Sequence, residues 1–188
     1  MDNDSNTQNN MQICRLVQLA KSKDTNAFAK LYEMVYIDMY KMALYTLGSR
    51  TDAEDIVSET VLDAYTSIHK LRNNEAFKGW IFRILSNKCK RKIKSYQAER
   101  TYKKDEFSEE ALSDASLYDM DNILERHDIL NAFNALSPEE RLIVSMIIYS
   151  GYTSKETAHI LNKNHNTVRS KYRRSLDKLR QKLEAPNI

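Results

Sequence analysis

The side chains in this sequence best suited to chemistry are basic and amide groups close to the C-terminus. With Asn164 as a helix cap, helical spacing places five of them on one outward face: His165, Asn166, Arg169, Ser170 and Arg173. Arginine can donate two hydrogen bonds to guanine, and asparagine can pair in the same way with adenine. The pattern predicts a helix that reads base edges in the major groove of DNA, with Lys171 and Arg174 better placed for phosphates. An ordinary solvated basic face is the alternative interpretation.

A second basic segment, residues 88–94, follows closely after several aromatic residues. A mixture of cations and rings suits single-stranded or distorted DNA. Phe77 and Trp80 follow the apolar stripe of a helix, so we expect these two rings in the core. The candidate DNA contacts lie on the opposite side of the same helix: Arg83, Asn87, Lys90, Arg91 and Lys94.

An acidic outer face marks a third predicted helix. Its start is predicted from Thr51-Asp52-Ala53-Glu54, a capping box in which the threonine and the glutamate satisfy backbone donors at each other's positions. A stripe of apolar residues faces the core. The side chains that remain directed toward solvent or a partner are Asp52, Asp55, Ser58, Glu59 and Asp63.

None of the recognisable catalytic or metal-binding motifs occurs. The four histidines lack ligand spacing, no serine or cysteine stands in a nucleophile motif, and there is no glycine-rich phosphate loop. The carboxylates between the two basic segments lack the alternating spacing of a calcium loop. We therefore expect no enzyme activity, no cofactor, no metal site and no small-molecule substrate.

The elements that position these side chains are predicted to be helices. The 188 residues include only three glycines and two prolines, whereas strong helix formers are plentiful. Helical spacing of apolar residues predicts a short helix around 13–20, a longer one over 26–47 that Gly48 ends, and helices around 52–65 and 77–93. The predicted fold class is all-α.

A loss of hydrophobic periodicity, together with a gain of acidic residues, predicts a flexible acidic linker between two small helical domains. We expect four parts along the chain: a disordered tail over 1–10, a first domain over 11–97, the linker over 98–123 and a second domain over 124–188.

The second domain is predicted to contain a helix-turn-helix. Two capping boxes begin at Ser137 and Thr153, and Gly151 ends the helix between them. The three residues 162–164 separate the next, short helix from the basic last helix. A short helix, a tight turn and a basic helix in this order are typical of DNA-binding domains.

The composition favours a protein of the cytoplasm. The formal net charge is only +3, and the two cysteines, Cys14 and Cys89, lack the spacing of a disulfide or zinc framework. The first ten residues are polar, and no stretch reaches the roughly 20 apolar residues that a membrane span needs.

Taken together, four motifs resemble the sigma factors of the extracytoplasmic-function (ECF) group, in the sigma-70 family. In order along the chain they are DAEDIVSET over 52–60, FKGWIFRI over 77–84, LSPEER over 136–141 and NTVRS over 166–170. Each motif is weak alone, but their order and separation are specific. The resemblance covers nearly the whole chain after the tail.

This resemblance implies a transcription initiation factor that binds core RNA polymerase and directs it to promoter DNA. The acidic helix would bind the polymerase clamp. The loop 69–75 and the helix after it would recognise and help to melt the −10 element as separated strands, and the helix-turn-helix would read the −35 element as duplex. The linker would run through the polymerase cleft. An anti-sigma factor would regulate the chain.

Three residues depart from the pattern of the family. Ser58 stands where glutamine is usual in the acidic helix. Thr157 replaces an aliphatic residue, and Asn162 replaces the usual glycine of the turn. Because asparagine tolerates the left-handed backbone conformation, we expect the turn to survive.

Two other classes of protein would share part of this pattern. A helix-turn-helix regulator that binds a palindrome as a dimer would explain the second domain equally well, but not the acidic helix followed by an aromatic and basic one. A helical adaptor that uses both domains only for protein contacts would leave the basic faces unused.

Overall fold

The computed structural model describes residues 2–102 and 123–184, and within these two ranges every regular element is a helix. The all-α prediction is therefore confirmed. The helices before the linker are α1 (Asp2–Lys21), α2 (Thr25–Glu33), α3 (Tyr36–Leu47), α4 (Arg50–Ser67), the short 3₁₀ turns η1 (Ile68–Lys70) and η2 (Asn74–Ala76), and α5 (Phe77–Tyr102). Those after it are α6 (Ile123–Asn134), α7 (Pro138–Ser150), α8 (Ser154–Leu161) and α9 (His165–Glu184).

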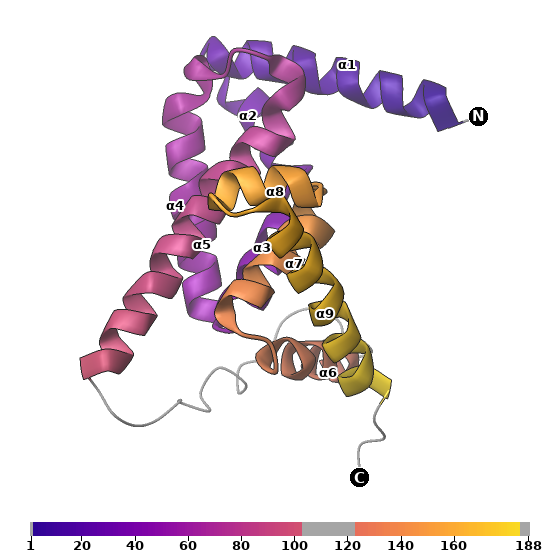
Figure 1. The fold of residues 1–188 in the computed structure, drawn as a ribbon. Helices are drawn as coiled ribbons and strands as arrows, with labels where there is room; N and C mark the ends of the chain where they lie inside the picture. The colour runs from indigo at the N-terminus through magenta and orange to yellow at the C-terminus, as the bar shows by residue number, and fades with distance from the viewer. Residues whose placement is uncertain (1, 103–122, 185–188) are drawn as a thin grey trace.

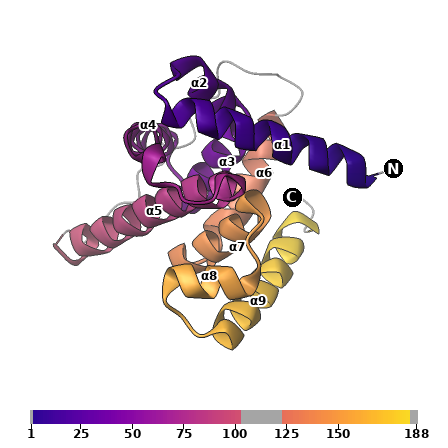
Figure 2. The same ribbon diagram turned by 90° about the horizontal axis from the view of Figure 1, so that it is seen from above.

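The helices of the two halves pack directly against each other. α7 lies along α3 and also contacts α5, while α8 and α9 follow on the outer side of α7 (Figure 1). The view from above shows α7, α8 and α9 grouped on one side of α5, with α1 crossing the other end of the molecule (Figure 2). We call this packing of α7 and α8 onto α3 and α5 the closed arrangement.

One apolar core runs through both halves. Its largest fully buried side chains include Met39 and Phe82 before the linker and Ile143 and Met146 after it. Phe77 is buried at 1% exposure and Trp80 packs partly buried against the same core, as expected for the stripe of α5. A smaller cluster joins Tyr45 of α3 to residues of α6, α7 and α9.

The N-terminal helices differ from the sequence prediction in two ways. α1 extends back to Asp2, so residues 2–10, expected to be a disordered tail, are helical. The single helix expected over 26–47 is divided, because α2 ends at Glu33 and α3 begins at Tyr36. At the break, the N–H of Val35 donates to the carbonyl of Tyr32, a tighter bond than the α-helical one, and Val35 itself is buried.

The start of α4 also differs. Ser49 is the N-cap, and its hydroxyl accepts the N–H of Asp52, so the predicted cap at Thr51 is wrong. Glu54, expected to complete the capping box, pairs with Arg50 one turn away at 3.0 Å. Serine and threonine are both good caps, and the two lie only two residues apart, so tertiary packing decides between them. Gly48, in the left-handed conformation, ends α3 as predicted.

Part of the segment predicted as a linker is helical. α5 continues without interruption to Tyr102, so the first five positions assigned to the linker, 98–102, are helical. Residues 103–122, which hold the acidic side chains of the predicted linker, lie outside the described residues.

The local signals in the second half are confirmed. Ser137 with Glu140 and Thr153 with Glu156 form complete capping boxes, with the backbone N–H groups of Ser137 and Thr153 donating to the two carboxylates. Gly151 ends α7 in the left-handed conformation. Asn162 adopts the same conformation with φ of 53°, so the turn before α9 forms without glycine.

No helix within residues 2–102 and 123–184 is both long enough and apolar enough to cross a lipid bilayer.

Thr157 generates a stability prediction. It is fully buried on α8, and its hydroxyl has no hydrogen-bond partner among the described residues. Valine has nearly the same shape without the polar group, so Thr157→Val should raise the free energy of unfolding by about 1 kcal/mol, measured by urea denaturation.

Thr153→Val is the matched control, because it makes the same chemical change four residues earlier at the N-cap of α8. It should lower the free energy of unfolding by about 1 kcal/mol. A loss of stability in both variants would mean that the Thr157 hydroxyl is satisfied in solution.

Candidate functional site

The exposed face of α9 collects the predicted base-reading residues. The Asn164 side chain accepts the N–H of Asn166 at 2.8 Å and holds the first turn of the helix. Val168, Ser175 and Leu179 form the buried side. The predicted contacts that are exposed to solvent are His165, Asn166, Arg169, Ser170, Arg173 and Arg174. The structure therefore brings these six side chains onto the accessible part of one helix.

The side chains of this face differ in how strongly they are held. His165 Nε2 lies 3.1 Å from the Ser154 hydroxyl of α8, and Arg174 Nε donates to the Ser170 carbonyl at 3.3 Å. Arg169 and Arg173 make no hydrogen bond or ion pair within residues 2–102 and 123–184. These two guanidinium groups are therefore available to an acceptor from outside the chain.

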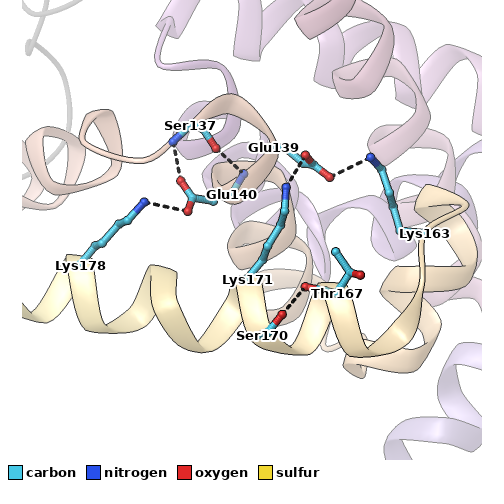
Figure 3. A network of polar contacts seen from close by, with 8 residues as sticks. All are labelled: Ser137, Glu139, Glu140, Lys163, Thr167, Ser170, Lys171 and Lys178. Atoms are coloured by element: carbon cyan, nitrogen blue, oxygen red, sulfur yellow. Dashed lines mark hydrogen bonds and ion pairs between the residues drawn. The ribbon is translucent and has the colours of Figure 1, made fainter.

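Lys171, predicted to contact phosphates, is instead paired with α7. Its Nζ lies 2.6 Å from Glu139 Oε2, and Lys163 Nζ lies 3.1 Å from Oε1 of the same carboxylate. A second pair follows further along α9, where Lys178 Nζ lies 2.8 Å from Glu140 Oε1 (Figure 3). The phosphate contact of Lys171 stays a prediction, because forming it requires this lysine to leave Glu139.

The electrostatics of the two carboxylates reflect these pairs. The hydrogen bond from Lys171 lowers the pKa of Glu139 most; burial opposes it, and the ion pair with Lys163 lowers the pKa further. Burial alone would raise the pKa of Glu140, but hydrogen bonds from Lys178 and from Ser137 lower it to about 2. Both groups are therefore charged at neutral pH.

The predicted DNA face of α5 is mostly accessible but touches the second half of the chain. Arg83, Asn87, Arg91 and Lys94 are exposed. Lys90 is half-buried, and its Nζ donates at 3.4 Å to the carbonyl of Leu161, the last residue of α8. About three helical turns earlier, the Tyr152 hydroxyl donates to the carbonyl of Gly79 in the first turn of α5.

The loop before α5 is anchored to α1. Lys21 Nζ donates to the side-chain oxygen of Asn74 at 2.5 Å, and the Asn74 amide donates to the carbonyl of Cys14 at 3.4 Å. Neither contact follows from local sequence signals. Together they hold the loop 69–75 against the N-terminal helix, beside the first turn of α5.

The acidic face of α4 is divided between solvent and α5. Asp52 pairs with Lys92 at 2.7 Å and accepts a hydrogen bond from the Tyr96 hydroxyl. Burial would raise the pKa of Asp52, but the bonds from Lys92 and Tyr96 lower it. Asp52 is thus directed into the interface with α5 and is the least exposed of the five predicted residues, whereas Asp55 and Ser58 are exposed.

Sequence reasoning did not predict that Lys88 contacts the acidic face of α4. It was grouped with the basic residues of α5, but its side chain is only 8% exposed. Its Nζ lies 3.1 Å from Glu59 and 2.8 Å from Asp63, so it holds the acidic face of α4 in place. The only sequence signal was its position one helical turn before Lys92, which makes the equivalent contact with Asp52.

Comparison with known proteins identifies both halves. Residues 31–99 match the family "Sigma-70 region 2" and residues 132–181 match "Sigma-70, region 4". The chain is 25% identical to the ECF RNA polymerase sigma factor BldN of Streptomyces coelicolor, over 85% of this chain and 61% of that protein. It is also 25% identical to the ECF RNA polymerase sigma factor SigW of Bacillus subtilis, over 92% of this chain and 97% of that protein.

A solved structure shares the fold. It is the sigma factor RpoE in complex with the anti-sigma factor NepR from Bartonella quintana, with a TM-score of 0.66 and 23% identity, covering 85% of this chain and 98% of RpoE.

The lowered pKa of Glu140 predicts a pH dependence of stability. A carboxylate whose pKa falls on folding stabilises the folded state above its ordinary value of 4.5, and this contribution is lost as the pH falls toward about 2. Glu140→Gln should therefore lower the free energy of unfolding by about 1–2 kcal/mol above about pH 5 and reduce its acid dependence. Urea unfolding followed from pH 2 to 6 measures both effects.

Lys178→Gln provides the companion variant, since it removes one of the hydrogen bonds that lower this pKa. It should lose part of the same acid dependence. An unchanged dependence in Glu140→Gln would show that other carboxylates carry it.

Proposed function

The chain belongs to the ECF group of the sigma-70 family, and on this premise we propose how its surfaces act in transcription initiation. The protein is a transcription initiation factor, not an enzyme, that binds core RNA polymerase and promoter DNA. Its second domain reads the −35 element, its first domain recognises and helps to melt the −10 element, and α4 contributes to polymerase binding.

The exposed face of α9 is the observation that carries the proposal. Arg169 and Arg173 lie about 40° apart around the helix axis, so they point the same way. Asn166 lies about one turn before Arg169. Bidentate recognition of guanine by arginine requires a guanidinium group that is not already paired, and both groups meet that requirement. Geometry and charge therefore support the reading of a duplex by this helix.

The −10 element is assigned to the exposed side of α5 and the loop before it. Arg83, Asn87, Arg91 and Lys94 form a stripe of donors along α5 that could follow a strand of DNA. The contacts of Asn74 with α1 give the loop a fixed position beside the first turn of this stripe. A base that leaves the stack requires a preformed surface of this kind.

Polymerase binding is assigned to the part of α4 that α5 does not occupy. Asp55 and Ser58 are exposed, and Leu62 is 65% exposed on the same side. Glu59 and Asp63 remain candidates as well, although each shares its charge with Lys88.

The closed arrangement conflicts with simultaneous reading of both elements. Lys90 of α5 and Leu161 beside the start of α9 are in contact at 3.4 Å, whereas elements named −10 and −35 lie about 25 base pairs, roughly 85 Å, apart along duplex DNA. The two domains therefore separate on the promoter, and an anti-sigma factor regulates the chain by binding a state that cannot make both contacts.

Such a protein acts where RNA polymerase is found, so we place it in the cytoplasm. The rival function, a dimeric regulator that binds a palindrome, would use α9 in the same way. It gives no role to the exposed acidic face of α4.

The test of the proposed function is transcription in vitro from a pool of promoter sequences, with core RNA polymerase present or absent. Start sites should require both proteins and should share a pair of upstream boxes. Tight binding to a palindrome without polymerase would support the dimeric regulator instead.

Arg169→Ala should weaken discrimination at the upstream box by about 1–3 kcal/mol if this arginine is bidentate to guanine. Competition between the enriched box and single-base variants, scored in the same transcription assay, measures the effect. Arg180→Ala is the matched control. It also removes an arginine from α9, but this arginine pairs with Glu184 at 3.2 Å, so it should not change discrimination between bases. An equal loss on every sequence would argue against base reading by Arg169.

Asp55→Lys should weaken binding to core polymerase at least tenfold, because charge reversal at the centre of an interface costs several kcal/mol. Fluorescence anisotropy of the labelled chain titrated with core polymerase measures the affinity. Glu33→Lys makes the same charge change on the exposed surface of α2 and should bind as the wild type does. Equal losses in the two variants would point to long-range charge rather than contact.

A further inference from the structure

We propose that Glu139 is a positioning residue for duplex reading, which holds Lys163 and Lys171 away from DNA phosphates. The inference rests on the proposed reading of duplex DNA by α9 and deepens it. Its effect is on specificity, since phosphate contacts strengthen binding to every sequence, whereas base contacts distinguish one sequence from another.

The geometry of the carboxylate supports this role. Glu139 is in the first turn of α7 and is not part of the capping box, which Ser137 and Glu140 complete. Its two oxygens are each occupied by a different lysine, one from the turn before α9 and one from the second turn of α9 (Figure 3). One side chain therefore joins α7 to two points of the helix-turn-helix.

The direction of Lys171 separates it from the reading face. At about 100° per residue, Lys171 lies about 160° around the helix axis from both Arg169 and Arg173. Its side chain is 29% exposed, and it reaches back to α7 beside the buried residues of α9. While it is paired with Glu139, this lysine cannot follow the same DNA groove as the two arginines.

A second carboxylate fixes the rotation of α9. Glu140, next to Glu139, binds Lys178, which lies seven residues after Lys171. Seven residues are nearly two helical turns, about 10.5 Å along the axis. Two adjacent acidic residues therefore hold two points on one side of α9, and a helix held in this way presents the opposite side, with Arg169 and Arg173, to the groove.

These pairs matter more for neutralising the two lysines than for the stability of the fold. Both partners of each Glu139 pair are between 29% and 47% exposed, and ion pairs in such positions add little to folding. Each lysine that becomes free to contact a phosphate, however, steepens the salt dependence of DNA binding by about 0.9 in log–log slope. Neutralising two lysines thus weakens binding to random sequences.

The experiment measures the salt dependence of binding for the full chain on a 30-base-pair duplex of random sequence. Glu139→Gln releases both lysines and keeps the size of the side chain. Its slope of log affinity against log salt concentration should be steeper than that of the wild type by up to about 2, from two added phosphate contacts. Preference for the enriched upstream box over a scrambled one should fall in the same variant.

Two matched variants isolate the lysines. Glu156→Gln removes a carboxylate from the same domain that contacts Thr153 and no lysine, so its slope should equal that of the wild type. Adding Lys163→Gln and Lys171→Gln to Glu139→Gln should restore the wild-type slope, because the cations that gained phosphates are gone.

Two results would overturn the proposal. The first is an unchanged slope in Glu139→Gln. The second is a shallower slope when Lys171→Gln is made in the wild-type chain, since Lys171 would then contact phosphates despite Glu139. Absence of any duplex binding by the wild type, alone and with core polymerase, would instead contradict the proposed reading by α9.

Discussion

The packing of α7 against α3 is the interaction on which the rest of the structure depends. α7 buries Leu142, Ile143 and Met146 in the common core, and full burial of a side chain of this size contributes roughly 1.5–3 kcal/mol. α3 and α7 approach each other closely where α3 ends: a Cβ atom at Gly48 would lie 3.0 Å from Arg141 Nη1. α7 also carries Glu139 and Glu140, which hold α9. The same helix therefore joins the second half of the chain to the first and orients the exposed face of α9.

Local signals predicted the second half of the chain more completely than the first. Caps at Ser137 and Thr153 and left-handed ends at Gly151 and Asn162 each depend on a few neighbouring residues, so their chemistry can be read directly from the sequence. The exposed side of α9 followed from the same periodicity. By contrast, Ser49 and Thr51 are equivalent as caps, and only the packing of α4 distinguishes them.

Pairs between distant segments could not be predicted because periodicity gives the face of a helix but not what that face meets. Lys88 and Lys92 are 29 and 40 residues from the acidic partners they reach, Glu59 and Asp52, and Lys171 is 32 residues from Glu139. The sequence alone places Lys88 and Lys92 only within the basic segment 88–94 and predicts that Lys171 contacts phosphates. Where α4 packs against α5 and α7 packs against α9, some of the charged side chains turn inward and pair with one another. Both the acidic and the basic surfaces are therefore smaller than the sequence suggests.

The freedom of Arg169 and Arg173 from contacts inside the described chain has a consequence for divergence after gene duplication. Substitutions at these positions remove no hydrogen bond or ion pair within residues 2–102 and 123–184, so under the proposed reading by α9 a copied gene can acquire a new preference for the −35 element without compensating changes. Lys171 and Lys178, on the opposite side of α9, differ, because their substitution would remove ion pairs with Glu139 and Glu140 of α7. Under the proposed reading by α9, changes of preference for the −35 element are thereby confined to one side of this helix, while the other side is inherited with the fold.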